Sequence, residues 1–406
     1  MTTTNCPYNP FDREVLDDPF PAYREARGSC PVHHFTEQEP GFYTAFRYDD
    51  VVAVVSNPDE WTATYGLSPR FQRGVGFNNE GSEHRKFRKA TVDSLTPRNL
   101  KVVEPEIRQL VDELLGNMAA TTSGDFHEMF AAPLPIGVIA RLMGITGDLG
   151  HFKKLSDALM EEGMNNADSD GAGFRRVLAE LNSYWAEQLA PRRALLSEVD
   201  DPNPSHLGAE LPDDIMSRLL LFRNDDGEAL SEFEINNTLM NMLLAGNETT
   251  TSLLTNLVWR LLEDRSRWET VQDDRSLLPN AIEESLRFDA PVLGMFRTSL
   301  TETELGGVGI PAKTKIMATY GSANRDPEKF SEPDEFRLDR PRGEVLQHMA
   351  FGRGPHACPG APLTRLEVTI AMNGLLDRFP DLRLDGFSER ITPFNFWGRR
   401  YLPLAW

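Results

Sequence analysis

Apolar residues spaced three and four positions apart run through most of the chain after about residue 100. Such spacing places them on one face of an α-helix. It predicts helices over residues 104–120 (EPEIRQLVDELLGNMAA), 168–189 (DSDGAGFRRVLAELNSYWAEQL) and 213–222 (DDIMSRLLLF). Residues 198–212 are polar and rich in Pro and Gly, and we expect a loop there because helical spacing resumes directly after them.

The other apolar runs are shorter. Residues 21–27 indicate a helix, whereas the β-branched and aromatic residues at 41–48, 51–55 and 297–316 predict strands. Helix therefore dominates, and the β content lies in small pieces toward both ends. The pattern predicts a mainly α fold with small β-sheets, in a single domain over residues 1–406 whose mixed α/β region covers about 1–65.

The longest predicted helix begins after Ser231. Ser231-Glu232-Phe233-Glu234 fits a capping box, in which the Ser and Glu side chains satisfy each other's backbone amides. Helical spacing continues to about Asp264, roughly 50 Å at ~1.5 Å per residue, which is long enough to cross a whole domain. Its middle is weakened, because a glycine, Gly246, costs about 1 kcal/mol relative to Ala and the neighbouring Thr hydroxyls compete for backbone carbonyls.

Composition and charge narrow the classes of function. The chain has 42 Lys and Arg against 62 Asp and Glu, a net charge of −20, which disfavours binding to nucleic acid. Only three cysteines occur, Cys6, Cys30 and Cys358, and such a sparse count is typical of a reducing compartment. The chain opens without a signal-peptide pattern and contains no uniformly apolar stretch of 18 residues. We expect a cytoplasmic monomer that binds no membrane.

Residues 351–360, FGRGPHACPG, are the most informative stretch. Three Gly and two Pro among ten residues exclude a helix or a central strand and predict a rigid loop. Cys358 lies near the end of this loop, just before an amphipathic helix whose dipole and free amides stabilise a thiolate.

Several roles for Cys358 compete. A buried structural cysteine needs no surrounding Gly and Pro. A zinc site needs further Cys or His at ligand spacing, which the sequence lacks, and a nucleophile needs a base, for which His356 is awkwardly close. The role that remains is an axial thiolate ligand to haem iron, with the glycines letting the backbone approach the porphyrin.

This loop resembles the haem-binding loop of the cytochrome P-450 family. It matches the family pattern Phe-Gly-x-Gly-x-His-x-Cys-x-Gly at every fixed position. Glu284 and Arg287 match the Glu-x-x-Arg motif, which in the family forms a buried network with a later Arg, here Arg340. Residues 245–250 are similar to the oxygen-activating motif of the family's long central helix, which crosses the haem. The order of these segments agrees from about residue 10 to the C-terminus.

The resemblance implies a haem-thiolate monooxygenase that inserts one oxygen atom of dioxygen into a small, largely apolar organic substrate, by hydroxylation or oxidative dealkylation. The cofactor is expected to be heme b. In this reading Cys358 binds the iron, while Gly246, Glu248 and Thr249 make room for oxygen and deliver protons. The residues expected to hold the haem are His84, Arg88, Arg297 and His356, which match the positions that bind its propionates, and Phe351, Gly352 and Gly360 of the loop.

The resemblance specifies the substrate and the electron donor only loosely. The substrate-contacting segments of the family correspond to residues 65–81, 165–174, 293–296 and 394–396 and to two positions of the long helix. The residues expected to contact the substrate are Leu244, Asn247, Leu293, Met295 and Phe396. We expect no fused reductase, and therefore expect electrons from NAD(P)H through a ferredoxin-type carrier and its reductase. The carrier would dock near Arg85, Lys86 and Lys89, a basic patch in an acidic chain.

Two alternatives stay open. A peroxide-driven peroxygenase is a haem-thiolate enzyme that usually lacks the acid–Thr pair, which this chain has at Glu248-Thr249. A non-catalytic haem-binding sensor belongs to another class and would need neither a proton relay nor a basic docking patch.

Pro359 departs from the usual family pattern, in which a residue with a free amide follows the cysteine. Proline has no amide to donate toward the thiolate sulfur, so the thiolate should be more basic and the ferric/ferrous potential lower. Pro359→Leu restores the amide and should raise the potential by some tens of millivolts, because one hydrogen bond is worth about 1 kcal/mol. Spectroelectrochemical titration of both proteins checks this, and an unchanged or lower potential with an intact haem spectrum contradicts it.

Overall fold

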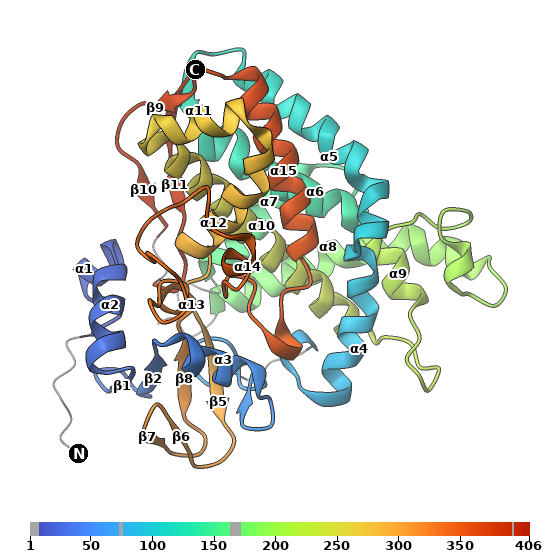
Figure 1. Cartoon of the computed structure of the whole chain (residues 1–406). Helices are drawn as coiled ribbons and strands as arrows, with labels where there is room; N and C mark the ends of the chain where they lie inside the picture. The colour runs from blue at the N-terminus through green and yellow to red at the C-terminus, as the bar shows by residue number, and fades with distance from the viewer. Residues whose placement is uncertain (1–7, 73–75, 163–171, 392–393) are drawn as a thin grey trace.

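The computed structural model describes residues 8–72, 76–162, 172–391 and 394–406. One long helix, α10 (Glu232–Glu263), runs through the middle of the molecule (Figure 1). Ser231 caps it with both bonds of the predicted capping box, and the helix continues through Gly246 without a break. Helices α6 (Pro133–Met143), α12 (Leu278–Phe288) and α15 (Ala361–Arg378) pack against it.

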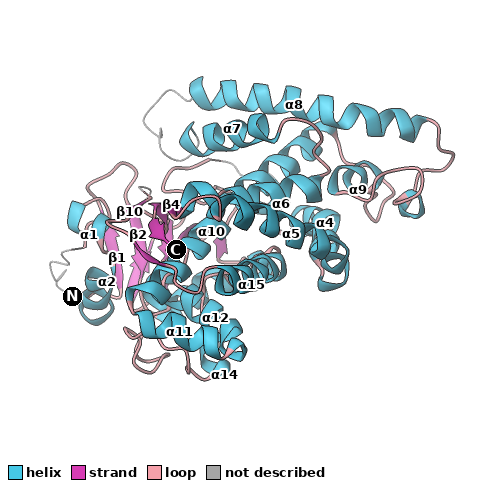
Figure 2. Ribbon diagram, turned by 90° about the horizontal axis from the view of Figure 1, so that it is seen from above, coloured by secondary structure: helices cyan, strands magenta, loops and turns pink. Residues whose placement is uncertain are grey.

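The other helices form the bulk of the molecule, and α7 and α8 lie side by side at one edge of it (Figure 2). Their bounds are α1 Arg13–Asp17, α2 Phe20–Ser29, α3 Tyr48–Ser56, α4 Gly81–Val92, α5 Pro97–Met118, α7 Leu149–Met160, α8 Ala172–Ser197, α9 Ile215–Leu221, α11 Arg265–Asp273, α13 Tyr320–Ala323 and α14 Arg342–Val345. Among the described residues, no helix is long and apolar enough to cross a membrane.

The strands form small sheets that gather at the left of the molecule in Figure 2. The largest sheet has the order β1-β2-β8-β5-β3, in which β2 and β8 pair in parallel and the other neighbours antiparallel. A second sheet has the order β4-β12-β9, and β6-β7 and β10-β11 are two-stranded ribbons. The bounds are β1 Val32–Phe35, β2 Phe42–Ala45, β3 Trp61–Thr62, β4 Ser123–Asp125, β5 Met295–Ser299, β6 Thr303–Leu305, β7 Val308–Ile310, β8 Lys315–Ala318, β9 Arg383–Leu384, β10 Glu389–Arg390, β11 Arg399–Tyr401 and β12 Pro403–Ala405.

The predicted mainly α fold with small sheets is confirmed, and one predicted strand is wrong. Residues 51–55 lie in helix α3, not in a strand. Two acidic residues in its first turn favour a helix N-terminus, and Val51, Val54 and Val55 share one buried helical face. The helix predicted over 168–189 is present as α8 from Ala172 onward, and its first four residues lie outside the described part of the chain.

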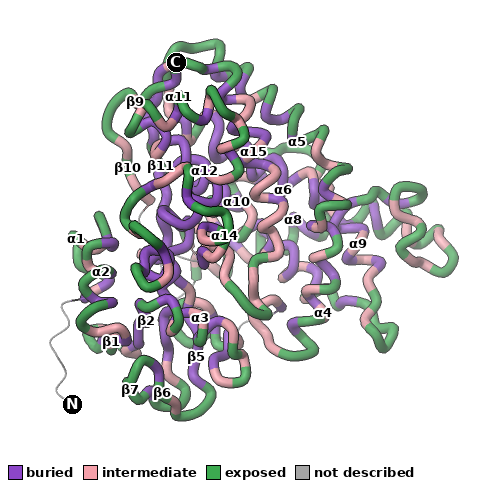
Figure 3. Tube along the Cα trace, viewed as in Figure 1, coloured by how far each residue is buried: buried purple, intermediate pink, exposed green. Residues whose placement is uncertain are grey.

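The main hydrophobic core surrounds the second half of α10 (Figure 3). Leu253, Leu254 and Leu257 are fully buried there, and so are Trp185 and Trp268 on neighbouring helices. Neighbouring elements cover this half of α10 on all sides, so apolar side chains on any of its faces avoid water. This explains why α10 is apolar around much of its circumference there.

A buried ionic cluster ties α12 to the segment that precedes the Cys358 loop. The Glu284 carboxylate accepts hydrogen bonds at 2.8 Å from both Nε and Nη2 of Arg287, and at 2.9 and 3.1 Å from Nε of Arg340. All three side chains are fully buried. Because an unpaired charge in the protein interior is very costly, this cluster fixes the position of the chain around Arg340.

A second carboxylate on the same helix reaches the Cys358 loop through Arg365. Glu283 accepts hydrogen bonds from Arg365 of α15 at 2.5 and 2.9 Å, and its carboxylate lies 2.9 Å from Nε2 of His348. The Arg365 guanidinium in turn lies 4.7 Å from the centre of the Phe351 ring. Burial by itself raises the pKa of Glu283, but the bonds from Arg365 and His348 outweigh it and bring the pKa to about 2.

From the Glu283 cluster we predict how the stability of the fold changes in acid. A carboxylate whose pKa is lowered in the folded state stabilises the fold above its ordinary pKa of 4.5, and this contribution is lost as the pH falls from there toward about 2. Glu283→Gln should therefore cost about 3 kcal/mol at pH 7, and this difference should shrink only below pH ~4.5. Urea unfolding at several pH values measures it.

Glu269→Gln is the matched control, because Glu269 pairs with Arg265 on the surface, where an ion pair contributes about 0–1 kcal/mol. A Glu283→Gln effect no larger than that of the control would contradict the role given to the buried cluster.

Candidate active site

The loop that carries Cys358 is closed by a backbone hydrogen bond of 2.8 Å from the Cys358 amide to the Phe351 carbonyl. Gly352 and Gly354 take positive φ angles of 64° and 73°, which only glycine adopts without strain. A Cβ on Gly354 would lie 2.9 Å from the Cα of Ser56 in α3, so this glycine also permits close contact between the loop and that helix. Residues Gly354–His356 form one 3-10 turn, and α15 begins just after the cysteine.

The Cys358 thiol is the only free cysteine among the described residues, and it is accessible from one side. Protein atoms surround it on the others, and this burial raises its pKa, although the backbone amides of Gly360 and Ala361 and the charges of Arg88 and Arg365 act in the opposite direction. The donors to the sulfur are thus the second and third amides after the cysteine, beyond Pro359. A thiol with a raised pKa becomes a thiolate when a metal ion binds it.

Basic side chains from two distant segments meet beside the thiol. The rings of His84 and His356 lie 4.3 Å apart, and Arg88 donates a 2.6 Å hydrogen bond to the Ala357 carbonyl. Burial lowers the pKa of His84 to about 4, and the positive charges of His356 and Arg88 add to this effect. Glu80 partly compensates them, since its carboxylate lies 2.9 Å from Nε2 of His356.

Arg297 does not join this group directly. It lies in β5, is almost fully buried and donates to the carbonyl of Phe296 at 2.9 Å. It hydrogen-bonds the hydroxyl of Tyr320. That hydroxyl lies 3.7 Å from the position a Cβ would take on Gly352, so Arg297 approaches the Cys358 loop through Tyr320.

The middle of α10 carries the residues predicted to make room for oxygen and to deliver protons. The Thr249 hydroxyl donates to the Ala245 carbonyl at 2.9 Å, and the backbone stays helical. Burial raises the pKa of Glu248, with His127 and Lys153 lowering it and Asp157 raising it further. A Cβ on Gly246 would lie 3.3 Å from the Ile139 side chain, so this glycine provides close packing against α6. One turn later, Thr250 and Thr364 join α10 to α15 through a 3.5 Å hydroxyl contact.

The predicted substrate residues are not all brought together. Leu244 is half-buried on α10, whereas Met295 and Phe396 belong to the core of the largest sheet. Asn247 turns its amide toward α7, where it donates to the Ser156 hydroxyl at 3.1 Å. Leu293 is buried in a separate aromatic cluster near α2, because Gly321 leaves room for its side chain there, so it lies in the core rather than in a cavity.

The predicted docking patch is only partly a free positive surface. Lys86 is mostly buried and lies 2.5 Å from the Glu234 carboxylate, and Lys89 pairs with Asp225 at 2.6 Å. Arg85 is exposed on the same helix.

Several residues of the site were missed by sequence reasoning. Glu80 precedes His84 by four positions, and Glu283 adjoins Glu284, so their spacing to recognised residues was the available signal. Arg365 and Tyr320 carried no such signal, since their neighbours in space lie far away in the sequence.

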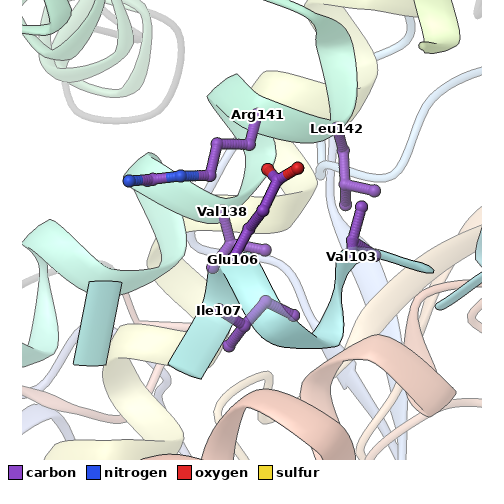
Figure 4. Close-up of a pocket in the computed structure, with 6 residues that line it drawn as sticks. All are labelled: Val103, Glu106, Ile107, Val138, Arg141 and Leu142. Carbon is purple, nitrogen blue, oxygen red and sulfur yellow. The ribbon is translucent and has the colours of Figure 1, made fainter. Parts of the chain in front are cut away.

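Two surface clefts lie away from these groups. A small one between α5 and α6 has no room for a water molecule, and the side chains of Glu106 and Arg141 flank it (Figure 4). A larger one, about 720 Å³, is lined by residues of α1, α2 and Tyr8. Neither contains a predicted site residue.

The chemistry of the donor set fits a haem. An accessible thiol that has backbone amides around its sulfur suits an iron ion, and a cluster of Arg88, His84 and His356 next to it suits the two carboxylates of the porphyrin. The loop glycines keep the backbone free of side chains beside the thiol, as a flat ring requires.

Comparison with known proteins agrees with this chemistry. The family model for cytochrome P450 matches residues 166–384. Cytochrome P450 109 of Bacillus spizizenii is 33% identical over 395 residues, covering 95% of this chain and 91% of that protein. The erythromycin C-12 hydroxylase of Saccharopolyspora erythraea is 35% identical over 376 residues, covering 90% and 89%.

Solved structures show the same fold. CYP109E1 of Bacillus megaterium, in complex with corticosterone, superposes with a TM-score of 0.82 at 30% identity, covering 97% of this chain and 99% of that one. The cytochrome P450 PksS of Bacillus subtilis superposes with a TM-score of 0.86 at 28% identity, covering 98% and 99%. The chain therefore belongs to the cytochrome P450 family and is a monooxygenase.

Proposed function

We propose that this chain, as one domain over residues 1–406, is a haem-thiolate monooxygenase that hydroxylates or oxidatively dealkylates a small, largely apolar organic substrate. The observation that carries the proposal is the accessible Cys358 thiol beside the His84, Arg88 and His356 cluster. A thiol in that position has few roles other than binding a metal inside an anionic ring.

When bound, heme b would supply the reduction of dioxygen and the transfer of one oxygen atom to substrate. Cys358 would bind the iron, and Gly360 and Ala361 would moderate the basicity of the sulfur through their amides. Arg88, His84 and His356 would bind the propionates, with Arg297 contributing from the side of Tyr320. Phe351, Gly352 and Gly360 would keep the loop flat against the ring.

Protons would reach the oxygen from α10. Glu248 is buried enough for its pKa to be raised, which lets it hold and release a proton nearer neutral pH. The Thr249 hydroxyl, now bonded to the Ala245 carbonyl, can turn to donate or accept on the opposite side. The close packing at Gly246 keeps this turn of α10 fixed while the side chains exchange protons.

Two kinds of observation support the proposed substrate site: the compounds named for related proteins and the packing of the candidate residues. Related proteins are named for erythromycin hydroxylation or are seen with corticosterone, which supports an apolar ring system of similar chemistry. Leu244, Met295 and Phe396 supply apolar surface, and Asn247 has its amide committed to Ser156. Leu293 is buried in a core cluster, as Phe396 is, and both stay in the proposed substrate set.

Electrons would come from NAD(P)H through a ferredoxin-type carrier and its reductase, in the cytoplasm, with the enzyme acting as a monomer. Arg85 offers an exposed positive charge on α4, the helix whose Arg88 contacts the Cys358 loop. Lys86 and Lys89 are already paired, so a carrier would have to displace Glu234 or Asp225 to use them.

The proposed ligand is tested by the spectrum of the reduced protein with carbon monoxide. The purified protein should bind haem and show the red-shifted Soret band of a thiolate-ligated iron, because the thiolate donates electron density to it. Cys358→His should move the band to the position of a histidine-ligated haem. A histidine-type spectrum in the unmutated protein would contradict the proposal.

The role of Thr249 is tested by coupling. In Thr249→Ala the proton supply is mistimed, so NAD(P)H consumption should continue while product per NAD(P)H falls several-fold and hydrogen peroxide appears. The assay uses a compound that shifts the ferric haem to high spin. Thr270→Ala is the control, since Thr270 makes the same bond to a carbonyl four residues earlier, at 2.7 Å, on the exposed helix α11. Equal coupling in both variants would remove Thr249 from the proton path.

A further inference from the structure

Lys315 is a fully buried lysine at the start of β8. Its ammonium donates hydrogen bonds to the backbone carbonyls of Tyr65 at 2.7 Å and Gly66 at 2.9 Å. The same nitrogen lies 5.1 Å from the centre of the Phe71 ring, close enough for a cation–π interaction. One side chain of the central sheet thus contacts both ends of the segment from Tyr65 to Phe71.

No carboxylate in the described part of the chain forms an ion pair with Lys315. Burial lowers its pKa to about 8, and the positive charge of Arg297 adds to this effect. A buried ammonium is costly unless hydrogen bonds replace its water. The carbonyls of Tyr65 and Gly66 and the ring of Phe71 provide that replacement, so the lysine and the loop depend on each other.

Residues 65–72, the clamped loop, form a compact turn. The Gln72 amide donates to the Tyr65 carbonyl at 3.1 Å, and the rings of Tyr65 and Phe71 lie 6.3 Å apart. Gly66 has a φ of +90°, and a Cβ there would lie 2.9 Å from the Gln72 carbonyl oxygen. The turn is therefore tightly closed, and its shape is set by its own backbone together with Lys315.

The described residues after the clamped loop, from Gly76 onward, reach the site. Gly76 lies against α10, where a Cβ would come within 2.9 Å of the Asn237 amide. Glu80 then bonds the Ala63 amide at 2.9 Å and lies beside His356. The connection from β3 to α4 is thus held at α10, at the Cys358 loop and, through Lys315, at the central sheet.

We propose that Lys315 is a positioning residue for substrate binding: by clamping residues 65–72 to the sheet it holds this loop ready over the substrate space. The inference rests on the proposed function, with residues 65–81 as one of the segments expected to contact the substrate. A loop ordered in advance contributes its contacts to a ligand without first losing conformational entropy. Ligands large enough to touch the loop should therefore depend on Lys315, and ligands confined to the iron should not.

The test uses Lys315→Met, which keeps the length of the side chain and removes its charge and donors. Lys313→Met is the control, because Lys313 is exposed two residues earlier. Hydrogen exchange of the peptide covering residues 62–72 should be at least tenfold faster in Lys315→Met than in the control, with α10 unchanged. Imidazole and the bulky azole clotrimazole serve as probes of the ferric haem. Clotrimazole should bind about tenfold more weakly and imidazole equally well, since only the larger probe reaches the loop.

Gly66→Ala provides a second variant in case Lys315→Met does not fold, because a Cβ at φ +90° would meet the Gln72 carbonyl and distort the turn that Lys315 binds, without altering the sheet. It should reproduce both the faster exchange and the selective loss of clotrimazole affinity. Unchanged exchange in the loop, or equal losses for both azoles, overturns the proposal. A carbon monoxide spectrum lacking the thiolate band in the unmutated protein would instead overturn the proposed function, and the exchange measurement would still decide whether the clamp exists.

Discussion

The hydrogen bond from the Cys358 amide to the Phe351 carbonyl closes the loop on which the whole site depends. It holds the sulfur at a fixed place before α15, and two left-handed glycines make the closure possible. Side chains and one helix from other parts of the chain contact this loop. Arg88 bonds its Ala357 carbonyl, Arg365 lies over the Phe351 ring, and α3 packs against Gly354. A thiol presented in this way can bind a metal without any rearrangement of the backbone.

The charged side chains near Cys358 also favour binding at its thiol. The chain carries a net charge of −20, yet the guanidinium groups of Arg88 and Arg365 both act on the Cys358 sulfur. Acidic residues compensate the basic side chains selectively: Glu80 adjoins His356 and Glu283 binds Arg365, whereas among the described residues Arg88 bonds only a carbonyl. The positive charge of Arg88 therefore stays available beside the thiol, where it stabilises an anionic group.

Sequence patterns predicted those parts of the molecule that depend on neighbours in the chain. The capping box at Ser231, the length of α10 and the loop before α15 all follow from local spacing. The strand predicted at residues 51–55 failed because a run of valines suits both a strand and a buried helix face. The clamp at Lys315 and the place of Leu293 in the core could not be predicted, since each depends on which distant segment packs against it.

The pairing of early and late residues has a consequence for how the protein is made. Arg88 and the carbonyl that it bonds are 269 positions apart, and Glu80 and His356 are 276 apart. Contacts between such remote parts of a chain form late in folding, after the entropy of closing a long loop has been overcome. During synthesis the α4 segment must therefore wait, with its basic side chains exposed to water, until nearly nine-tenths of the chain has left the ribosome. A prosthetic group can be captured only then, so insertion belongs to the final step of folding.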